Sequence, residues 1–345
     1  STSWLTERNG ESKVAIFNTP LFLWMLGIKV IASFLFASNL LISNYIPFVN
    51  YFVEHGFANP YQHFWELGQA ISFPFPALML WVLALPRLLL FPLWAWGSSV
   101  DLDIFIYRIP ILLADISLAL ILARWLKTKQ DKVLLYYWCS PILFYISYIA
   151  GNLDAIPIAM LFIFLFFLFK EKYPAAFLFL GFALATKTGL VILLPFVLVY
   201  LILEHQRYLS IAGLMAVPLA IYAVANAPYF FQPGFWELAS GGSDLLNVLR
   251  VQLTLSGNLI IYVAPLVYLG LLVRSSMFQT FNRDIFLMFL GFALGIIALF
   301  IPPAIGWYYW IVPFFIYFYI KEDRANRMPF LMLNVLYFFY FIAVE

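Results

Sequence analysis

A few ionisable residues stand inside or beside long apolar segments of this sequence, and they are the first candidates for chemistry. A charged side chain at membrane depth is costly, so it is usually kept for a functional reason. Lys187, in Ala-Thr-Lys-Thr-Gly between two short apolar segments, could hold a phosphate or pyrophosphate as a point charge. The alternative is a lysine whose stem lies along apolar surface while its ammonium reaches the interface.

Four further ionisable residues lie inside predicted helices or at their starts. Arg108 and Asp115 are seven residues apart, about 10 Å along a helix axis, so we do not expect them to pair with each other. Arg108 suits a lipid-linked phosphate or a structural role, and Asp115 is expected to pair with another helix. Asp154 could bind substrate or cap the helix that follows it. Lys29 is expected to reach towards the cytoplasmic side, unless it belongs to a site.

The stretch of residues 44–103 carries most of the candidate acids, together with a histidine: Glu54, His55, Glu66, Asp101 and Asp103. A carboxylate here could take the proton of an acceptor hydroxyl as a general base, and the alternative for each is a solvated loop acid. Asp-Leu-Asp at 101–103 resembles a metal-binding pair, although capping of a helix before Ile104 explains it equally well. The acidic pair leaves a divalent cation open as a cofactor, and the chemistry does not require it.

Aromatic residues make up 20% of the chain, and one cluster of them differs from the rest. Trp-Tyr-Tyr-Trp at 307–310 follows Pro302, Pro303 and Gly306, so Trp307 and Tyr308 form either an aromatic belt or a platform for stacking a sugar. The sequence has no Gly-rich phosphate loop, His-Glu-x-x-His motif or Cys cluster, so nucleotide and zinc chemistry have no support. A net charge of +2 does not indicate a nucleic-acid partner, and a single cysteine excludes an internal disulfide.

The composition determines which elements must position these residues. Hydrophobic residues make up 65% and charged residues 10% of the chain, whereas a soluble domain has about a quarter charged residues. Apolar segments near the roughly 20 residues that a spanning helix needs recur along the sequence, and they do not alternate as barrel strands do. We expect an all-α polytopic membrane protein, a single domain over 1–345, with about eleven transmembrane helices near 21–43, 104–125, 133–150, 155–170, 174–186, 188–204, 209–226, 257–273, 285–302, 306–320 and 328–344.

The placement of Lys and Arg predicts the orientation of these helices. With the amino terminus in the cytoplasm, the basic turns fall on the inner side, as the positive-inside rule requires. This holds only if 76–96, which three prolines interrupt, does not cross the membrane, so we expect a re-entrant or interfacial helical segment there. Residues 44–103 then form a long extracytoplasmic loop and 227–256 a second one, and the compact chain favours a bacterial cytoplasmic membrane.

The sequence resembles the GT-C superfamily of integral-membrane glycosyltransferases, in particular its polyprenyl-phosphate-sugar-dependent, mannosyltransferase-like members. Short motifs spread over most of the chain carry the resemblance through their order and spacing. They are Asn-Pro-Tyr (59–61), Phe-Pro-Phe-Pro-Ala-Leu-Met-Leu (73–80), Arg-Ile-Pro-Ile-Leu-Leu-Ala-Asp (108–115), Gly-Asn-Leu-Asp-Ala-Ile-Pro (151–157), Ala-Thr-Lys-Thr-Gly (185–189), Leu-Pro-Phe (194–196) and Gly-Trp-Tyr-Tyr-Trp-Ile-Val-Pro-Phe (306–314).

The resemblance implies inverting transfer of a hexose from a polyprenyl-phosphate-linked donor in the membrane to a glycan or lipid acceptor on the outer face. It implies Glu54 or Glu66 as the base, with Asp101 and Asp103 in reserve. It also implies phosphate contacts from Lys187 and Arg108, and a sugar pocket shaped by Trp307 and Tyr308. In such enzymes the base often lies at the exit of the first helix, and this sequence has no carboxylate there before Glu54.

Two other hypotheses remain beside the glycosyltransferase. A transporter or flippase for a lipid-linked or small polar solute would move its substrate without bond formation. A non-catalytic scaffold subunit would explain the missing acid at the exit of the first helix. The glycosyltransferase requires the acidic segment before Ile104 and the ammonium of Lys187 to converge in one pocket that opens away from the cytoplasm.

Overall fold

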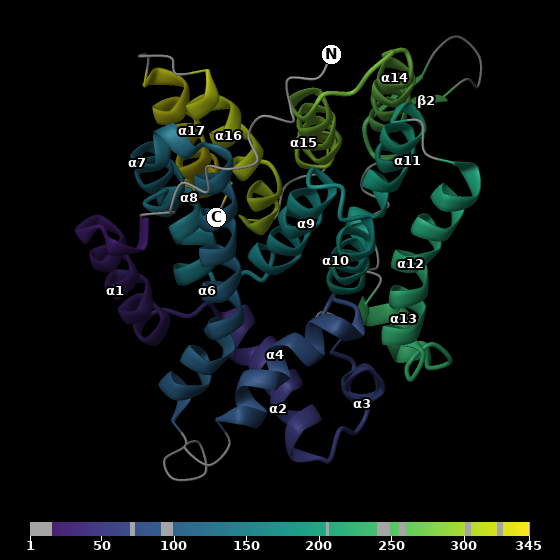
Figure 1. Cartoon of the computed structure of the whole chain (residues 1–345). Coiled ribbons are helices and arrows are strands. Elements are labelled where there is room, and N and C mark those ends of the chain that lie inside the picture. Colours follow the sequence, from purple (N-terminus) through teal and green to yellow (C-terminus); the bar gives the residue numbers. More distant parts are fainter. Residues whose placement is uncertain are drawn as a thin grey trace.

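The structure is a computed structural model, and it describes residues 16–69, 73–90, 99–204, 207–239, 249–254, 260–300, 305–322 and 327–344. Within these ranges the chain forms sixteen α-helices, with short 3-10 and π-helical turns and one two-stranded sheet. The prediction of an all-α fold is confirmed in this coarse form. Figure 1 shows the helices as a bundle, with several short helices gathered at one end.

The first half of the bundle is built around one long helix, α6 (Val100–Trp125), which begins where the Ser99 side chain accepts a hydrogen bond from the Leu102 N–H at 3.2 Å. It packs against α1, α4 and α9. The elements of this half are α1 (Pro20–Leu35), η3 (Leu41–Tyr45), α2 (Ile46–Glu54), α3 (Pro60–Glu66), α4 (Ala77–Leu89), α6, α7 (Gln130–Val133), η5 (Leu134–Trp138), α8 (Pro141–Phe144) and η6 (Tyr145–Ile149).

In the second half, α9 and α10 form the closest helix pair, and α10 also packs along α12. Gly181 of α10 permits this approach, because a Cβ there would lie 2.5 Å from the Ile221 side chain. The elements are α9 (Ala155–Leu168), α10 (Tyr173–Thr186), η7 (Thr188–Leu193), α11 (Leu194–Leu203), α12 (Tyr208–Asn226), α13 (Pro233–Ala239), β1 (Gln252–Thr254), β2 (Ile260–Tyr262), α14 (Val263–Ser276), α15 (Arg283–Phe300), η9 (Ile305–Trp310), α16 (Val312–Lys321) and α17 (Met328–Val344).

Three helices, α6, α12 and α15, are long and apolar enough to cross a membrane, judged by length and composition. Seven further apolar helical segments have between 10 and 17 residues. α6 and α15 lie largely inside the bundle, whereas α12 follows its edge and exposes most of its surface (Figure 1). Prolines and helix breaks shorten several predicted segments: 133–150, for example, is divided at Ser140 and Pro141.

One segment that was predicted to be a helix contains a strand in the structure. Residues 257–273 were expected to form a continuous helix, but residues 260–262 are strand β2, which pairs antiparallel with β1. Helix α14 begins only at Val263 and continues to Ser276. The sequence Ile-Ile-Tyr has the β-branched and aromatic residues that favour a strand, and hydropathy alone does not distinguish it from a helix start.

Helices α2, α3, α4 and α13 form a cap at one end of the molecule (Figure 1). Aromatic rings fill the interior of this cap: Phe48 stacks on Phe73 at 4.6 Å, and Tyr61 packs against Phe235 of α13 at 5.1 Å between ring centroids. The amide side chain of Asn226, at the end of α12, accepts a hydrogen bond from the Ala77 N–H at 2.9 Å and so fixes the start of α4. With 13 residues, α4 is about 20 Å long, shorter than a bilayer core.

Basic residues and their partners collect at the other end of the bundle. The Arg283 guanidinium lies 4.1 Å from the centre of the Trp125 ring, so the start of α15 contacts the end of α6. Lys321 pairs with Asp284, and Lys129 donates to the Ile320 carbonyl at 3.2 Å. Three of the predicted basic turns, near residues 124–132, 283 and 321, therefore lie together.

Candidate functional site

The acidic residues of the cap are organised around a buried arginine, Arg87 of α4, which is 3% exposed. Its Nη1 lies 2.6 Å from Asp103 Oδ1, and its Nη2 lies 2.9 Å from Glu54 Oε1. Asn50 donates to the other Asp103 oxygen at 3.4 Å. Three elements, α2, α4 and the first turn of α6, therefore meet in one charged cluster, which we call the Arg87 cluster: Asn50, Glu54, Arg87 and Asp103.

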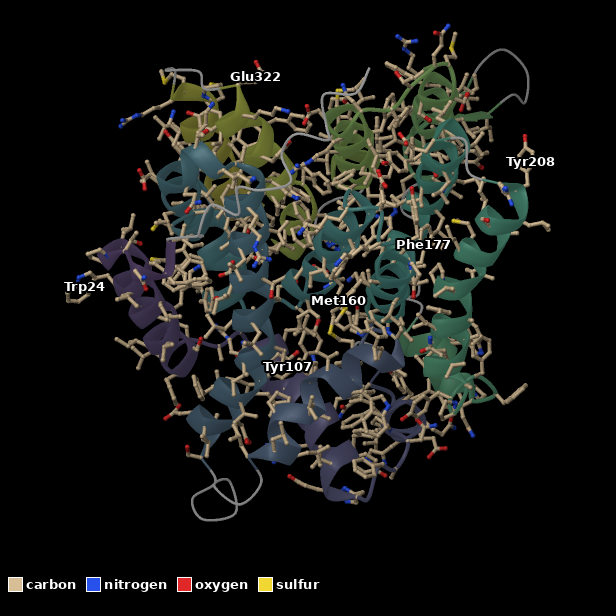
Figure 2. The ribbon with its side chains drawn as sticks, in the orientation of Figure 1. Trp24, Tyr107, Met160, Phe177, Tyr208 and Glu322 are labelled. Atoms are coloured by element: carbon tan, nitrogen blue, oxygen red, sulfur yellow. The ribbon has the colours of Figure 1, made fainter. Side chains whose placement is uncertain are left out.

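A small cavity of about 10 Å³ adjoins the Arg87 cluster. Tyr107 lines it together with Arg87 and Asp103, and Figure 2 shows Tyr107 low in the molecule near α4. The Tyr107 hydroxyl is buried and has no hydrogen-bond partner within the part of the chain that the structure describes. The cavity has room for about one water molecule, and its walls combine aliphatic side chains with the polar groups of Asn50, Arg87, Asp103 and Tyr107.

The other candidates of the first loop lie outside this cluster. Glu66 is exposed and accepts a hydrogen bond from Gln62 at 2.8 Å, and Asp101 is exposed in the first turn of α6. His55 is exposed, and its ring stacks on Tyr51 at 4.3 Å. These three have the surroundings of solvated surface side chains, whereas Glu54 and Asp103 are held in place.

Lys187 lies where α10 ends and η7 begins, in an extended conformation between the two helices. Its Nζ is 3.4 Å from Asp154 Oδ1, at the start of α9. The same ammonium is 4.5 Å from the ring centre of Phe75 and 5.6 Å from that of Trp310. The Lys187 side chain is 17% exposed and that of Asp154 is 1% exposed, so the carboxylate is buried whereas the lysine stays partly accessible.

Capping of the following helix was one of the two roles that the sequence allowed for Asp154, and its side chain does not perform it. It occupies the N-cap position of α9, but its side chain makes no capping hydrogen bond. Its backbone N–H donates instead to the Asn152 side chain at 2.8 Å, and its carboxylate faces Lys187. The charge of Asp154, together with burial, raises the pKa of the Tyr45 phenol well above its usual range, burial being the larger cause.

Helical turn η9 contacts this pair through its glycine and tryptophans. A Cβ on Gly306 would overlap the Asn152 side chain, so only glycine lets η9 approach the loop before Asp154 so closely. Trp310 faces Lys187 and stacks with Trp307 at 5.8 Å between ring centroids. Tyr308 points the other way and packs on Tyr337 of α17 at 5.1 Å. Of the two predicted sugar-pocket residues, Trp307 is therefore linked to Lys187 through Trp310, whereas Tyr308 packs on α17.

The Arg108 side chain binds backbone carbonyl groups. Its guanidinium donates to the Tyr148 carbonyl and, at 2.7 Å, to the Phe36 carbonyl, which lie at the ends of η6 and α1. The residue is 1% exposed. Carbonyls left free at helix ends need such donors, so the structure gives Arg108 a structural role in place of the predicted phosphate contact.

Sequence reasoning did not identify the buried partners of Lys29. Lys29 was expected to reach the cytoplasmic side, but it is 1% exposed and its Nζ lies 2.7 Å from Asp115 Oδ2. The Asp115 carboxylate also accepts hydrogen bonds from three tyrosines: Tyr137 at 2.8 Å, Tyr148 at 2.8 Å and Tyr309 at 3.3 Å. The prediction that Asp115 pairs with another helix is confirmed.

The structure keeps the acids before Ile104 apart from Lys187. Asp103 pairs with Arg87, and Lys187 pairs with Asp154. Tyr45 lies between the two groups: its ring is 6.4 Å from that of Tyr107, at the cavity, and 5.8 Å from that of Phe75, beside Lys187. Aromatic rings separate the two groups, and Lys187 does not line the cavity beside Arg87, so the described residues do not form the single pocket that was predicted.

A metal ion does not fit the Asp-Leu-Asp pair. Both Asp103 oxygens already accept hydrogen bonds, from Arg87 and Asn50, and Asp101 is exposed. Across the described ranges, no group of three His, Cys, Asp or Glu side chains is arranged to hold a metal ion.

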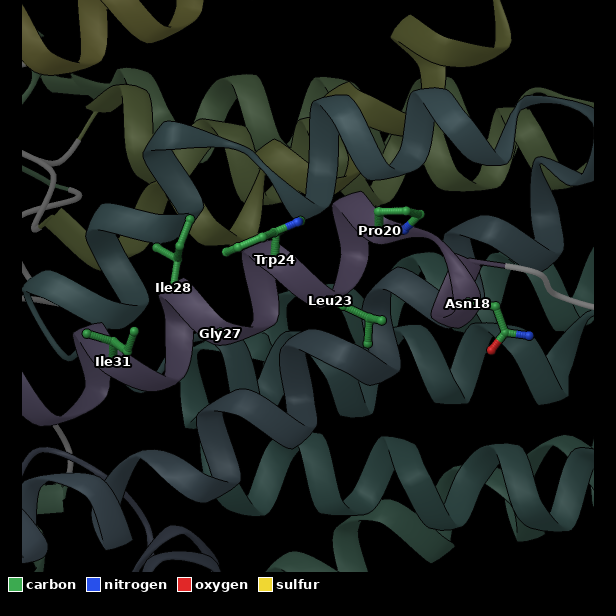
Figure 3. A pocket seen from close by; sticks show the side chains of 7 residues that line it. All are labelled: Asn18, Pro20, Leu23, Trp24, Gly27, Ile28 and Ile31. Carbon is green, nitrogen blue, oxygen red and sulfur yellow. The ribbon is translucent and has the colours of Figure 1, made fainter.

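A larger groove of about 510 Å³ runs along the outward face of α1 (Figure 3). Its walls are almost entirely apolar, with Trp24 75% exposed and Ile31 59% exposed. Such a surface suits lipid or another helix, and no charged side chain among the described residues lines it.

Comparisons with protein-family models, with curated proteins and with solved structures find no match to this chain.

Proposed function

We propose that the chain is a multi-pass integral membrane glycosyltransferase of a bacterial cytoplasmic membrane, with its amino terminus in the cytoplasm. It moves a hexose from a polyprenyl-phosphate-linked donor to a glycan or lipid acceptor on the extracytoplasmic face. The observation that carries the proposal is Lys187, a partly accessible ammonium beside a buried carboxylate and two aromatic rings.

The chemistry of these residues fits sugar transfer from a lipid phosphate. The acceptor oxygen attacks the anomeric carbon of the hexose, and the bond from that carbon to the phosphate oxygen breaks with inversion. The phosphate leaves with the electron pair, and Lys187 stabilises its charge. The acceptor proton passes to a carboxylate. Trp307, which is partly exposed and stacks on the buried Trp310, offers an aromatic face to the sugar ring.

Among the four loop acids, Glu54 and Asp103 support the role of base better than Glu66 and Asp101. The Glu54 side chain is 38% exposed and that of Asp103 is 17% exposed, so both remain partly accessible while Arg87 fixes their positions. The cavity beside them, with its Tyr107 hydroxyl, has room for about one water molecule, and the rings of Tyr45 and Phe75 separate it from Lys187. Transfer therefore requires these rings to move, so that the base and the phosphate contact meet around one substrate.

A transporter or flippase is the second candidate, and the Lys29–Asp115 pair favours it. Buried charges with polar partners inside a helix bundle often mark ion or proton pathways. A carrier would use this pair during transport, and would move the lipid-linked solute without cleaving it.

The test is a transfer assay with purified protein in lipid nanodiscs, using a panel of polyprenyl-phosphate hexoses labelled in the sugar. Release of free polyprenyl phosphate and labelling of an acceptor support the glycosyltransferase. Lys187→Gln should abolish transfer, whereas Lys172→Gln, the same change at the opposite end of α10, should not. Movement of intact donor across proteoliposomes without cleavage would support the carrier and overturn the proposal.

A further inference from the structure

Two lysine–aspartate pairs among the described residues, Lys29–Asp115 and Lys187–Asp154, differ in how many hydrogen bonds the carboxylate accepts. Asp115 receives Lys29 at 2.7 Å and hydrogen bonds from three tyrosines. Asp154 receives Lys187 at 3.4 Å, longer than the roughly 2.8 Å of a good charge-assisted hydrogen bond. Its Oδ1 is buried and has no hydrogen-bond partner among the described residues.

A buried carboxylate with unused hydrogen-bonding capacity is unusual, because the loss of water is normally compensated by other donors. The Asp154 Oδ1 atom, which faces Lys187 at 3.4 Å, can therefore accept a hydrogen bond from a further donor. Hydroxyl groups of a sugar are suitable donors, and Trp307 can offer the sugar an aromatic face, because it is partly exposed and stacks on Trp310 beside Lys187. The loop that carries Asp154 is fixed by Asn152 and Gly306, so the carboxylate is in a set position.

We infer that Lys187 and Asp154 form a latch that the donor opens. The donor phosphate takes the ammonium of Lys187 away from Asp154, and the released carboxylate accepts hydrogen bonds from hydroxyls of the hexose. The pair thereby distinguishes a sugar-loaded polyprenyl phosphate from the bare lipid phosphate, which opens the latch but leaves Asp154 without donors. This inference rests on the proposed function, since it concerns the same donor.

The test measures binding without turnover, using hexosyl polyprenyl phosphate and bare polyprenyl phosphate with protein in nanodiscs and no acceptor present. The wild type should bind the sugar-loaded lipid more tightly. Asp154→Asn removes the negative charge that competes for Lys187, so it should bind the bare lipid about tenfold more tightly and lose the preference for sugar. Lys187→Gln should lose binding of both lipids, and Lys172→Gln should match the wild type.

A merely structural pair would give a different pattern. Both Asp154→Asn and Lys187→Gln would then weaken binding of the two lipids alike, and that result would overturn the latch. If Asp154→Asn does not fold, infrared difference spectra of the wild type with labelled aspartate decide the question. Bare polyprenyl phosphate should shift one buried carboxylate band, and an unchanged band would contradict the inference.

The outcomes also separate the latch from the proposed function. In one outcome, Asp154→Asn binds the bare lipid more tightly and Lys187→Gln binds it less tightly, but no hexose is transferred to any acceptor. The proposed enzyme activity would then be wrong and the latch would stand. In the other outcome, the wild type transfers hexose, but Asp154→Asn keeps the wild-type preference for the sugar-loaded lipid. The latch would then be wrong and the proposed enzyme activity would stand.

Discussion

Lys29 of α1 and Asp115 of α6 meet at 2.7 Å with both side chains about 2% exposed, and they join the first helix to the centre of the bundle. The Lys29 ammonium also lies 3.4 Å from the centre of the Trp138 ring. Because Tyr309 of η9 donates to the same carboxylate, this pair also anchors the turn that carries Trp307 and Trp310. The pair therefore connects the stability of the bundle to the geometry of the candidate site.

Removing one member of this pair should destabilise the protein strongly. Lys29→Met leaves the Asp115 charge buried without its cation, and breaking such a pair costs about 3–5 kcal/mol. Lys29→Met with Asp115→Asn should recover most of the loss, because no charge of the pair is left buried and the amide oxygen can still accept from Tyr137 and Tyr309. Denaturant unfolding in micelles measures both. Lys321→Met, at a pair whose side chains are 43% and 37% exposed, is the control and should change stability by less than about 1 kcal/mol.

The sequence indicated the charged residues better than it indicated their partners. Four ionisable residues stood out because a charge within or beside an apolar segment is costly: Lys29, Asp115, Asp154 and Lys187. The three tyrosines on Asp115 did not stand out among 21 tyrosines, since only tertiary packing brings them together. An all-α fold follows from composition, whereas helix ends and the β1–β2 hairpin depend on local turns that hydropathy does not resolve.

Arg87 shows why part of the site could not be predicted. It follows Pro86 in the stretch 76–96, which was interpreted as re-entrant or interfacial, and it was not among the candidate residues. Its partners Glu54 and Asp103 lie 33 and 16 residues away in the sequence, and no short motif encodes that separation. The signal that could have found it is the rule applied to Lys187, an ionisable residue inside an apolar run.

Arg87→Met should open the cap. The Asp103 side chain, 17% exposed, would lose its guanidinium, and the ends of α2 and α4 would no longer be tied to α6. We expect faster proteolysis within residues 44–103 and a lower unfolding temperature. Glu54→Gln should have the smaller effect on stability, because that side chain is 38% exposed and water screens its pair. Equal effects of the two variants would contradict this order.

The loop acids should separate into two groups in a transfer assay. Asp103→Asn and Glu54→Gln remove carboxylates from the Arg87 cluster, and loss of the base should lower transfer by about 100-fold or more for one of them. Glu66→Gln and Asp101→Asn alter exposed side chains and should leave transfer within about twofold. Loss of transfer in Glu66→Gln would show that the base lies outside the Arg87 cluster.

Gly306→Ala should displace the loop before Asp154 and so weaken donor binding. The added Cβ overlaps the Asn152 side chain, so the loop before Asp154 and the turn that carries Trp310 must move apart. Overpacking of this kind costs about 1–3 kcal/mol, and donor binding should weaken with it. Gly213→Ala in α12 is the matched control, because nothing lies within 4 Å of its added Cβ and alanine favours the helix. Equal donor affinity in both variants would argue against the placement of Asp154 by this contact.

Trp310 and Tyr308, two residues apart in η9, should differ in their effect on donor binding. The Trp310 ring lies 5.6 Å from the Lys187 ammonium, and Gly189 leaves room for it, with an added Cβ 3.2 Å from the ring. Trp310→Leu should therefore weaken binding of a sugar-loaded lipid phosphate more than that of the bare lipid. Tyr308→Leu alters packing against Tyr337 and Phe341 of α17, so it should lower thermal stability and leave the preference for the sugar-loaded lipid intact. If Tyr308→Leu removed that preference while Trp310→Leu kept it, the sugar would lie on the α17 side of η9, away from Lys187.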